Sequence, residues 1–225
     1  MSFLNKLLGN SSLKNAIAQT EKARKAEGEE AEKLLQAACE SYAAISGKDS
    51  VMSEASYHWG LALMYLAQAK TGDDAAKFYQ QAGEKFSTAV TINPQYIDAL
   101  IDWGVALMGQ AQASGVDPDH SLYKEAEEKF LRADTLQQGA GAYNLACIQS
   151  LRGDYDACQK YLKIASENWK LPETEEILND SDIANAREQV WFQDFLDSLL
   201  AEEEEEVPVD EEADSEGEPK DASKT

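Results

Sequence analysis

The sequence predicts an all-α protein, a solenoid of antiparallel helix pairs that ends in a C-terminal capping helix and a disordered acidic tail. Three observations predict this architecture. The block Trp59 to Met64 recurs as Trp103 to Met108, an offset of 44 residues. Apolar residues within both blocks follow helical spacing. After Ala201 the chain becomes abruptly acidic.

Composition limits the class of protein before any motif is considered. The chain has 225 residues with 43% hydrophobic content, enough for a sizeable core. Its 42 acidic and 20 basic residues give a net charge of -22, which repels phosphate backbones and anionic lipids. We therefore expect no nucleic-acid partner and, since no apolar run is long enough to span a bilayer, no direct membrane insertion. Together with three cysteines, too few for a disulfide framework, these features predict a cytoplasmic protein.

The predicted organisation has three parts. Residues 1–11 form an N-terminal segment in which Phe3 to Leu8 make a capping turn on the first helix or, alternatively, a docking or membrane-touching peptide. A helical domain follows over 12–200, and an acidic tail over 201–225. The domain divides into four units and a last helix: 12–50, 51–94, 95–138, 139–170 and the capping helix 182–200.

Small and large residues alternate between the two helices of each unit. Gly60 and Ala82 let the helices of unit 51–94 approach closely, and Phe86 fills the space between them. Gly104, Ala126 and Phe130 repeat the pattern in unit 95–138. The opening unit 12–50 is a degenerate copy, because Ala38 and Tyr42 match Ala82 and Phe86 at the same offset but its first helix lacks the Trp-Gly pair.

Unit 139–170 is shorter than the two units before it. Leu145 and Ala146 take the Trp-Gly place, Gly153-Asp154-Tyr155 makes the turn, and Leu162 replaces the phenylalanine. Ten additional residues therefore surround the turn in units 51–94 and 95–138. We predict that each of their helices is longer by about five residues, roughly 7 Å.

The C-terminal segments differ in character. The capping helix carries a broad apolar face: Val190, Trp191, Phe192, Phe195, Leu196, Leu199 and Leu200. The tail from Glu202 onward holds twelve acidic residues against two lysines and no aromatic residue. Such a segment does not bury enough apolar surface to offset the entropy of ordering, so we expect disorder.

These residues resemble the tetratricopeptide repeat, a stack of antiparallel helix pairs. The pattern Trp/Leu-Gly/Ala, then Gly-Asp-Tyr, then Ala/Cys, Phe/Leu and Ala carries the resemblance over about residues 13–169, and Ala142 to Ala165 match it best. A HEAT-type array, with a period of about 40–47 residues, is the competing interpretation. Units longer than the usual length of about 34 residues resemble, in architecture only, the plant mitochondrial import receptor. That class carries a membrane anchor that we do not find here, so we do not transfer its location.

The resemblance implies a binding groove. In such repeats the first helix of each unit lines the concave surface. Carrying that register over selects Tyr57, Leu61, Met64, Ile101, Val105, Met108, Tyr143 and Cys147. An apolar groove with two methionines suits an amphipathic helix or an extended peptide of another protein.

The chain's own last helix is a second candidate occupant. Its anchors in the groove would be Trp191, Phe192, Phe195 and Leu199. The interpretation that we favour is simpler: these residues cap the end of the stack.

Catalysis is not expected. His58 and His120 have no cysteine or second histidine at ligand spacing, and Cys39, Cys147 and Cys158 occupy small-residue positions of helices. Phosphate-binding loops and hydrolase motifs are absent from the sequence. We therefore predict no catalytic residues, no metal and no cofactor.

The function predicted is that of a non-catalytic adaptor or assembly scaffold that binds another protein in its groove. One alternative is a chaperone or escort whose acidic tail attracts a basic or apolar client. Another is a structural protein that assembles through its own repeats. The sequence leaves the partner and the oligomeric state open.

Overall fold

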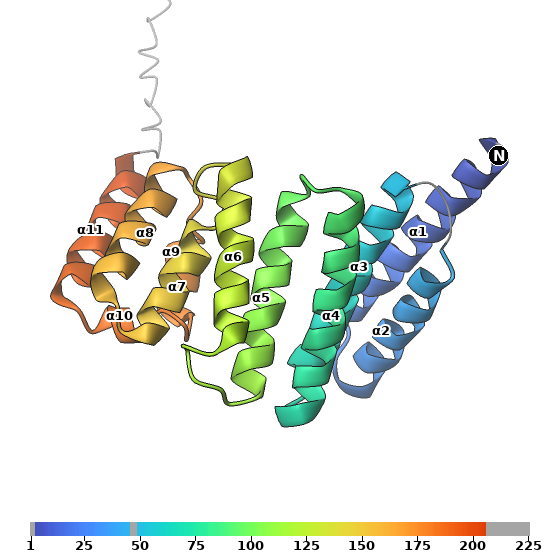
Figure 1. Cartoon of the computed structure of the whole chain (residues 1–225), viewed down its shortest axis with the longest axis horizontal. Coiled ribbons are helices and arrows are strands. Elements are labelled where there is room, and N and C mark those ends of the chain that lie inside the picture. Colours follow the sequence, from blue (N-terminus) through green and yellow to red (C-terminus); the bar gives the residue numbers. More distant parts are fainter. Residues whose placement is uncertain (1–2, 46–48, 206–225) are drawn as a thin grey trace, which may run out of the picture.

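The computed structural model describes residues 3–45 and 49–205, and within them every regular element is an α-helix. The all-helical prediction is confirmed. Helices α1 to α8 follow one another along the long axis of the molecule, with α1 at one end and α11 at the other (Figure 1). Their bounds are α1 Phe3–Arg24, α2 Gly28–Ala43, α3 Asp49–Gln68, α4 Gly72–Ile92, α5 Ile97–Ala113, α6 Ser121–Leu136, α7 Ala142–Arg152, α8 Tyr155–Glu167, α9 Thr174–Asn179, α10 Ala184–Arg187 and α11 Val190–Glu205.

Each helix from α1 to α8 packs on its neighbours in the chain, as a helical-repeat solenoid requires. Contacts join α1 to α2, α3 to α4, α5 to α6 and α7 to α8, and they also join each pair to the next. In addition α1 touches α3 and α3 touches α5. The first helices α1, α3 and α5 therefore lie side by side in one row.

A glycine facing a phenylalanine brings the helices of two pairs into close contact. A Cβ atom on Gly60 would lie 2.5 Å from the Phe86 ring, and one on Gly104 would lie 2.5 Å from the Phe130 ring. Both phenylalanines are fully buried. Since an alanine does not fit at either glycine, the two α-helical pairs share one packing geometry at an offset of 44 residues.

A second contact repeats at the same offset. The Lys85 ammonium lies 3.8 Å from the centre of the Trp59 ring, and the Lys129 ammonium lies 4.7 Å from the centre of the Trp103 ring. Each is a cation–π contact between a second helix and the first helix of the same pair. The tryptophans thus pack between helices and hold a lysine against the apolar core.

The long helices of the middle units differ between the two pairs. Helices α3 and α4 have 20 and 21 residues, whereas α7 and α8 have 11 and 13. The pair between them, α5 and α6, has helices of only 17 and 16 residues. The other residues of that unit's insertion lie in the loop 114–120. We expected each of these four helices to exceed its counterpart in α7 and α8 by about five residues. The observed excess is larger than that for α3 and α4 and smaller for α6.

Local signals explain the turn between α7 and α8. Gly153 ends α7 with a φ of 75°, a left-handed conformation that glycine adopts without steric cost. The Asp154 carboxylate then accepts a hydrogen bond of 3.1 Å from the backbone N–H of Ala157 and caps α8. The predicted Gly-Asp-Tyr turn is therefore built by a C-cap and an N-cap in succession.

The N-terminus differs from the expectation of a separate segment over 1–11. Helix α1 begins at Phe3 and runs without a break to Arg24, with Leu13, Ala16 and Ala23 buried. Residues 3–8 are therefore a helical extension instead of a capping turn. Their side chains lie outside the described residues, so the docking alternative stays a prediction.

The C-terminus differs as well. Residues 182–200 do not form one helix, because α10 ends at Arg187 and α11 begins at Val190. Helix α11 continues to Glu205, so the first five residues of the predicted tail are helical. Val190, expected on the apolar face, is 88% exposed at the break. The rest of the predicted disordered tail, 206–225, lies outside the described residues.

No helix within residues 3–45 and 49–205 combines the length and the apolar character that crossing a membrane requires.

The glycine–phenylalanine contact predicts opposite effects for two substitutions of helical glycines. Gly104→Ala forces a methyl group against the Phe130 ring, and we expect a net loss of about 1–2 kcal/mol in the free energy of unfolding. At Gly83 an added Cβ would lie 3.4 Å from Trp103 Nε1, an ordinary contact. Gly83→Ala should therefore be neutral or stabilise by up to about 1 kcal/mol through helix propensity.

Urea unfolding followed by circular dichroism measures both variants. Equal effects of the two substitutions would contradict the proposed packing.

Candidate functional site

The row of first helices presents one surface along matching faces of α3 and α5. We call it the first-helix surface. On α3 it consists of Glu54, His58, Leu61, Tyr65 and Gln68, and on α5 of Asp98, Asp102, Val105, Gly109 and Gln112. Residues at this spacing share one side of a helix, and each α5 residue lies 44 positions after its α3 counterpart.

Contacts between neighbouring first helices locate this surface. The Arg24 guanidinium of α1 lies 5.5 Å from the centre of the Tyr65 ring of α3. Asp102 of α5 interacts with Tyr57 of α3. On the far side, Gln112 donates a hydrogen bond of 2.6 Å to Asp182. The surface therefore runs from α1 across α3 and α5 to the C-terminal segment.

The polarity of the first-helix surface changes along its length. Glu54 and Asp98 are exposed at one end, and Gln68 and Gln112 are exposed at the other. Leu61 and Val105 are half-buried in the middle and belong to the rims of the core clusters. An apolar centre thus lies between an acidic end and a neutral polar end.

Burial perturbs the acid–base groups of this surface. Burial, with a smaller contribution from Asp98, raises the pKa of Asp102 to about 6, although its hydrogen bond with Tyr57 opposes the rise. Burial also lowers the pKa of His58, against the pull of Glu54 and Glu21. At neutral pH His58 is therefore mainly uncharged and Asp102 mainly ionised, which leaves the acidic end negative.

The eight predicted groove residues divide into three groups. Leu61 and Val105 lie on the first-helix surface. Tyr57, Ile101 and Tyr143 are half-buried between helices; the Tyr57 ring, for example, packs 4.8 Å from the Tyr96 ring. Met64, Met108 and Cys147 are buried, with 8%, 4% and 3% of their surface exposed. The two methionines expected to receive a ligand therefore belong to the core.

Sequence reasoning missed the polar members of the surface. It selected apolar residues for the groove and passed over Glu54, Asp98, Gln68 and Gln112, which share the same helical face. The signal was present, because the carboxylates recur at the offset of 44 residues. The first-helix surface is thus more acidic than the predicted groove.

The C-terminal segment covers the face of α7 that carries Tyr143 and Cys147. The Tyr143 hydroxyl donates a hydrogen bond of 2.8 Å to the Asp180 carboxylate, and the Cys147 thiol lies 3.7 Å from the same oxygen. The Ala186 backbone N–H donates to Ser150 Oγ at 3.3 Å. Ile177 and Ile183 are fully buried in this contact. Residues 177–186 therefore close the surface beyond α5.

The predicted anchors of the last helix lie elsewhere. Phe192 is buried in the core, whereas Trp191 and Phe195 line a cleft of about 780 Å³ between α11 and α8 together with Lys160 and Lys163. Leu199 is buried in the same cluster. In Figure 1, α11 stands beside α8 at the end of the stack. The segment that reaches the face of α7 is therefore 177–186, ahead of these anchors in the chain.

A metal site or an activated nucleophile would require suitable groups among the described residues. In the described part of the chain, no three His, Cys, Asp or Glu side chains are grouped so that they could hold a metal ion. Burial raises the pKa of the Cys39 thiol to about 11 and that of Cys158 to about 12, so neither thiol is an activated nucleophile.

A comparison with protein families decides the affiliation. The family model of the plant specific mitochondrial import receptor subunit TOM20 matches residues 31–161, more than half of the chain. The chain belongs to this family. The matched range runs from α2 into α8 and so includes the whole first-helix surface of α3 and α5. No curated protein matches the chain in a separate search.

Membership of the TOM20 family corrects the predicted location. A cytoplasmic protein was expected from the net charge and from the lack of a long apolar run. That prediction is wrong, because the TOM20 family is a mitochondrial import receptor at the outer mitochondrial membrane. The family description also names a receptor and not an enzyme.

The raised pKa of Asp102 predicts a pH dependence. The native state holds this proton more tightly than the unfolded chain, so stability falls as pH rises from about 4 to about 6. Asp102→Asn removes the titration. Between pH 4 and pH 7 the unsubstituted chain loses stability through this carboxyl and the variant does not. We therefore expect the free energy of unfolding of the variant minus that of the unsubstituted chain to rise by about 1–3 kcal/mol over this range.

Urea unfolding at both pH values gives this difference, and Asp156→Asn, at an exposed position on α8, serves as the control. An Asp102→Asn difference that does not change with pH would contradict the assignment.

Proposed function

We propose that the first-helix surface binds a positively charged amphipathic helix of a precursor protein. The receptor role comes from the family, and the surface supplies the chemistry. The observation that carries the proposal is the half-buried pair Leu61 and Val105 next to the exposed carboxylates Glu54 and Asp98. Apolar and acidic groups side by side match a helix that is apolar on one face and basic on the other.

Leu61 and Val105 form the apolar part of the site. They occupy equivalent positions of α3 and α5, which contact each other. A leucine-rich helix face laid over them would remove apolar surface of both molecules from water, at roughly 25 cal/mol per Å². Tyr65, half-buried beside Arg24, extends this part toward α1.

Carboxylates supply attraction and orientation. Glu54, Asp98 and Asp102 lie within two turns at the start of the surface, and the chain as a whole carries a charge of -22. A basic segment is therefore steered toward the acidic end, over a range set by a Debye length of about 8 Å at physiological salt. At the other end Gln68 and Gln112 carry no charge, and Asp182, which accepts a hydrogen bond from Gln112, is the carboxylate beside them. A basic group is therefore attracted more strongly to the end with three carboxylates.

The size of the surface limits the length of the ligand. From Glu54 to Gln68 the helix advances about 21 Å at 1.5 Å per residue. Beyond α5, residues 177–186 cover the face of α7. The surface therefore suits a single short helix of about four turns. An extended peptide that runs along all the repeats fits it less well.

Charge reversal at the acidic end tests this function. The probe is a fluorescein-labelled peptide of Leu, Ala, Ser and Arg whose sequence forms a basic amphipathic helix, and binding is followed by fluorescence anisotropy. We expect Glu54→Lys with Asp98→Lys to weaken binding by about tenfold at low salt, because attraction becomes repulsion. The effect should shrink as salt is raised.

A matched control separates the site from net charge. Glu84→Lys with Glu125→Lys makes the same change of net charge at exposed positions of the second helices α4 and α6. We expect binding within about twofold of the unsubstituted protein. Equal weakening by both double variants, or no binding by the unsubstituted protein, would refute the proposed site.

A further inference from the structure

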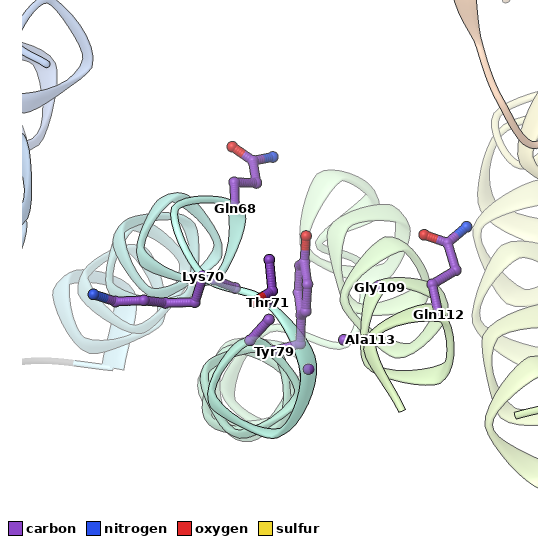
Figure 2. A pocket seen from close by; sticks show the side chains of 10 residues that line it. Gln68, Lys70, Thr71, Tyr79, Gly109, Gln112 and Ala113 are labelled. Atoms are coloured by element: carbon purple, nitrogen blue, oxygen red, sulfur yellow. The ribbon is translucent and has the colours of Figure 1, made fainter. Parts of the chain in front are cut away.

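A pocket opens at the neutral end of the first-helix surface. It lies between the end of α3, the start of α4 and the end of α5 and has a volume of about 430 Å³. Gln68 and Gln112 of the first-helix surface stand at its rim, together with Thr71 and Ala113 (Figure 2). The pocket thus continues the surface that begins at Glu54 and Asp98.

A difference between the two repeats leaves space for this pocket. Gly109 of α5 stands where α3 has Tyr65, 44 residues earlier. In the absence of a side chain at Gly109, the ring of Tyr79 from α4 leans against the α5 backbone, and a Cβ at Gly109 would come within 2.6 Å of it. A tyrosine at 109 would occupy this region. The glycine makes room for the Tyr79 ring, and the pocket opens beside that ring.

The lining of the pocket includes small apolar side chains and one aromatic ring. Ala67 and Ala75 are buried and form its floor with Gly109. The Tyr79 ring rises between α4 and α5 as one wall (Figure 2). A floor of small side chains beside an aromatic ring accepts a large apolar group, because the group then contacts carbon atoms on several sides.

The rim of the pocket is polar and uncharged. Lys70 lines the pocket through its backbone region, but its ammonium forms an ion pair of 2.8 Å with Glu32 and points away (Figure 2). The Tyr79 hydroxyl points toward the open side of the pocket, between Gln68 and Gln112. Hydroxyl and carboxamide groups at a rim can hydrogen-bond to the backbone of a bound chain without selecting a charge.

We propose that this pocket is the anchor subsite of the receptor and that it holds one large apolar side chain of the bound helix. The inference rests on the proposed function and adds to it one defined position of the ligand, the side chain that occupies this pocket. Continuity with Leu61 and Val105 along α3 and α5 identifies the occupant as a residue of the same bound segment. That residue lies at the end of the segment farthest from the contacts with Glu54 and Asp98.

Filling the pocket from two opposite walls tests the proposal. Thr71→Leu adds apolar atoms at the start of α4, where the threonine side chain makes no capping hydrogen bond, and Ala113→Leu adds them at the half-exposed end of α5. The probe is the same peptide, together with a set in which each leucine is replaced in turn by alanine. We expect each filled variant to bind the parent peptide about tenfold more weakly.

The peptide set shows whether one side chain is responsible. For one terminal leucine, replacement by alanine should weaken binding to the unsubstituted protein about tenfold and should cost nothing further in either filled variant. Replacement of the other leucines should cost the same in all proteins. Thr71→Val is the control that removes the hydroxyl with little filling, and urea unfolding midpoints establish that each variant is folded.

The outcomes separate this inference from the proposed function. If the filled variants bind every peptide as the unsubstituted protein does, while Glu54→Lys with Asp98→Lys still weakens binding, the subsite is refuted and the receptor surface stands. A uniform loss for every peptide refutes the subsite as well. If the parent peptide does not bind the unsubstituted protein, both proposals fall.

Discussion

The close contact between a glycine of a first helix and a phenylalanine of a second helix is the constraint on which the rest of the structure depends. Gly60 meets Phe86 and Gly104 meets Phe130 in the same way, 44 residues apart. Because the two contacts fix α3 and α5 in the same rotational setting, equivalent positions of both helices face the same side. The acidic, apolar and polar zones of the first-helix surface therefore line up across the two helices.

That surface combines features that are costly in the free protein and useful in a receptor. Asp102 is held in a partly buried place where its pKa rises to about 6, and Leu61 and Val105 remain partly open to water. A basic amphipathic helix would neutralise the first group and cover the second. The turn that closes the surface beyond α5 also carries two carboxylates, Asp180 and Asp182. Burial and the neighbouring Asp180 raise the pKa of Asp182 to about 6.

The sequence was sufficient to predict the helical pairs, because their period, small residues and turn signals are local. It was not sufficient where tertiary packing decides. Met64 and Met108 share a helix side with Leu61 and Val105, yet they turn into the interface with neighbouring helices, a depth that periodicity does not encode. The apolar run after Ile183 reads as one helix, although docking of 177–186 on α7 breaks it before Val190. The exchange of Tyr65 for Gly109 was visible in the repeat, but only the position of Tyr79 makes it a pocket.

The central claim is that a basic amphipathic helix binds across α3 and α5. Paramagnetic relaxation enhancement tests it most directly, with a spin label on the peptide and methyl-labelled protein. The account predicts strong broadening of the Leu61 and Val105 methyl signals, with little effect at Leu131 on α6 or at Val190 at the start of α11, both of which are exposed. Broadening centred on Leu131 or Val190, with Leu61 and Val105 unaffected, would contradict it.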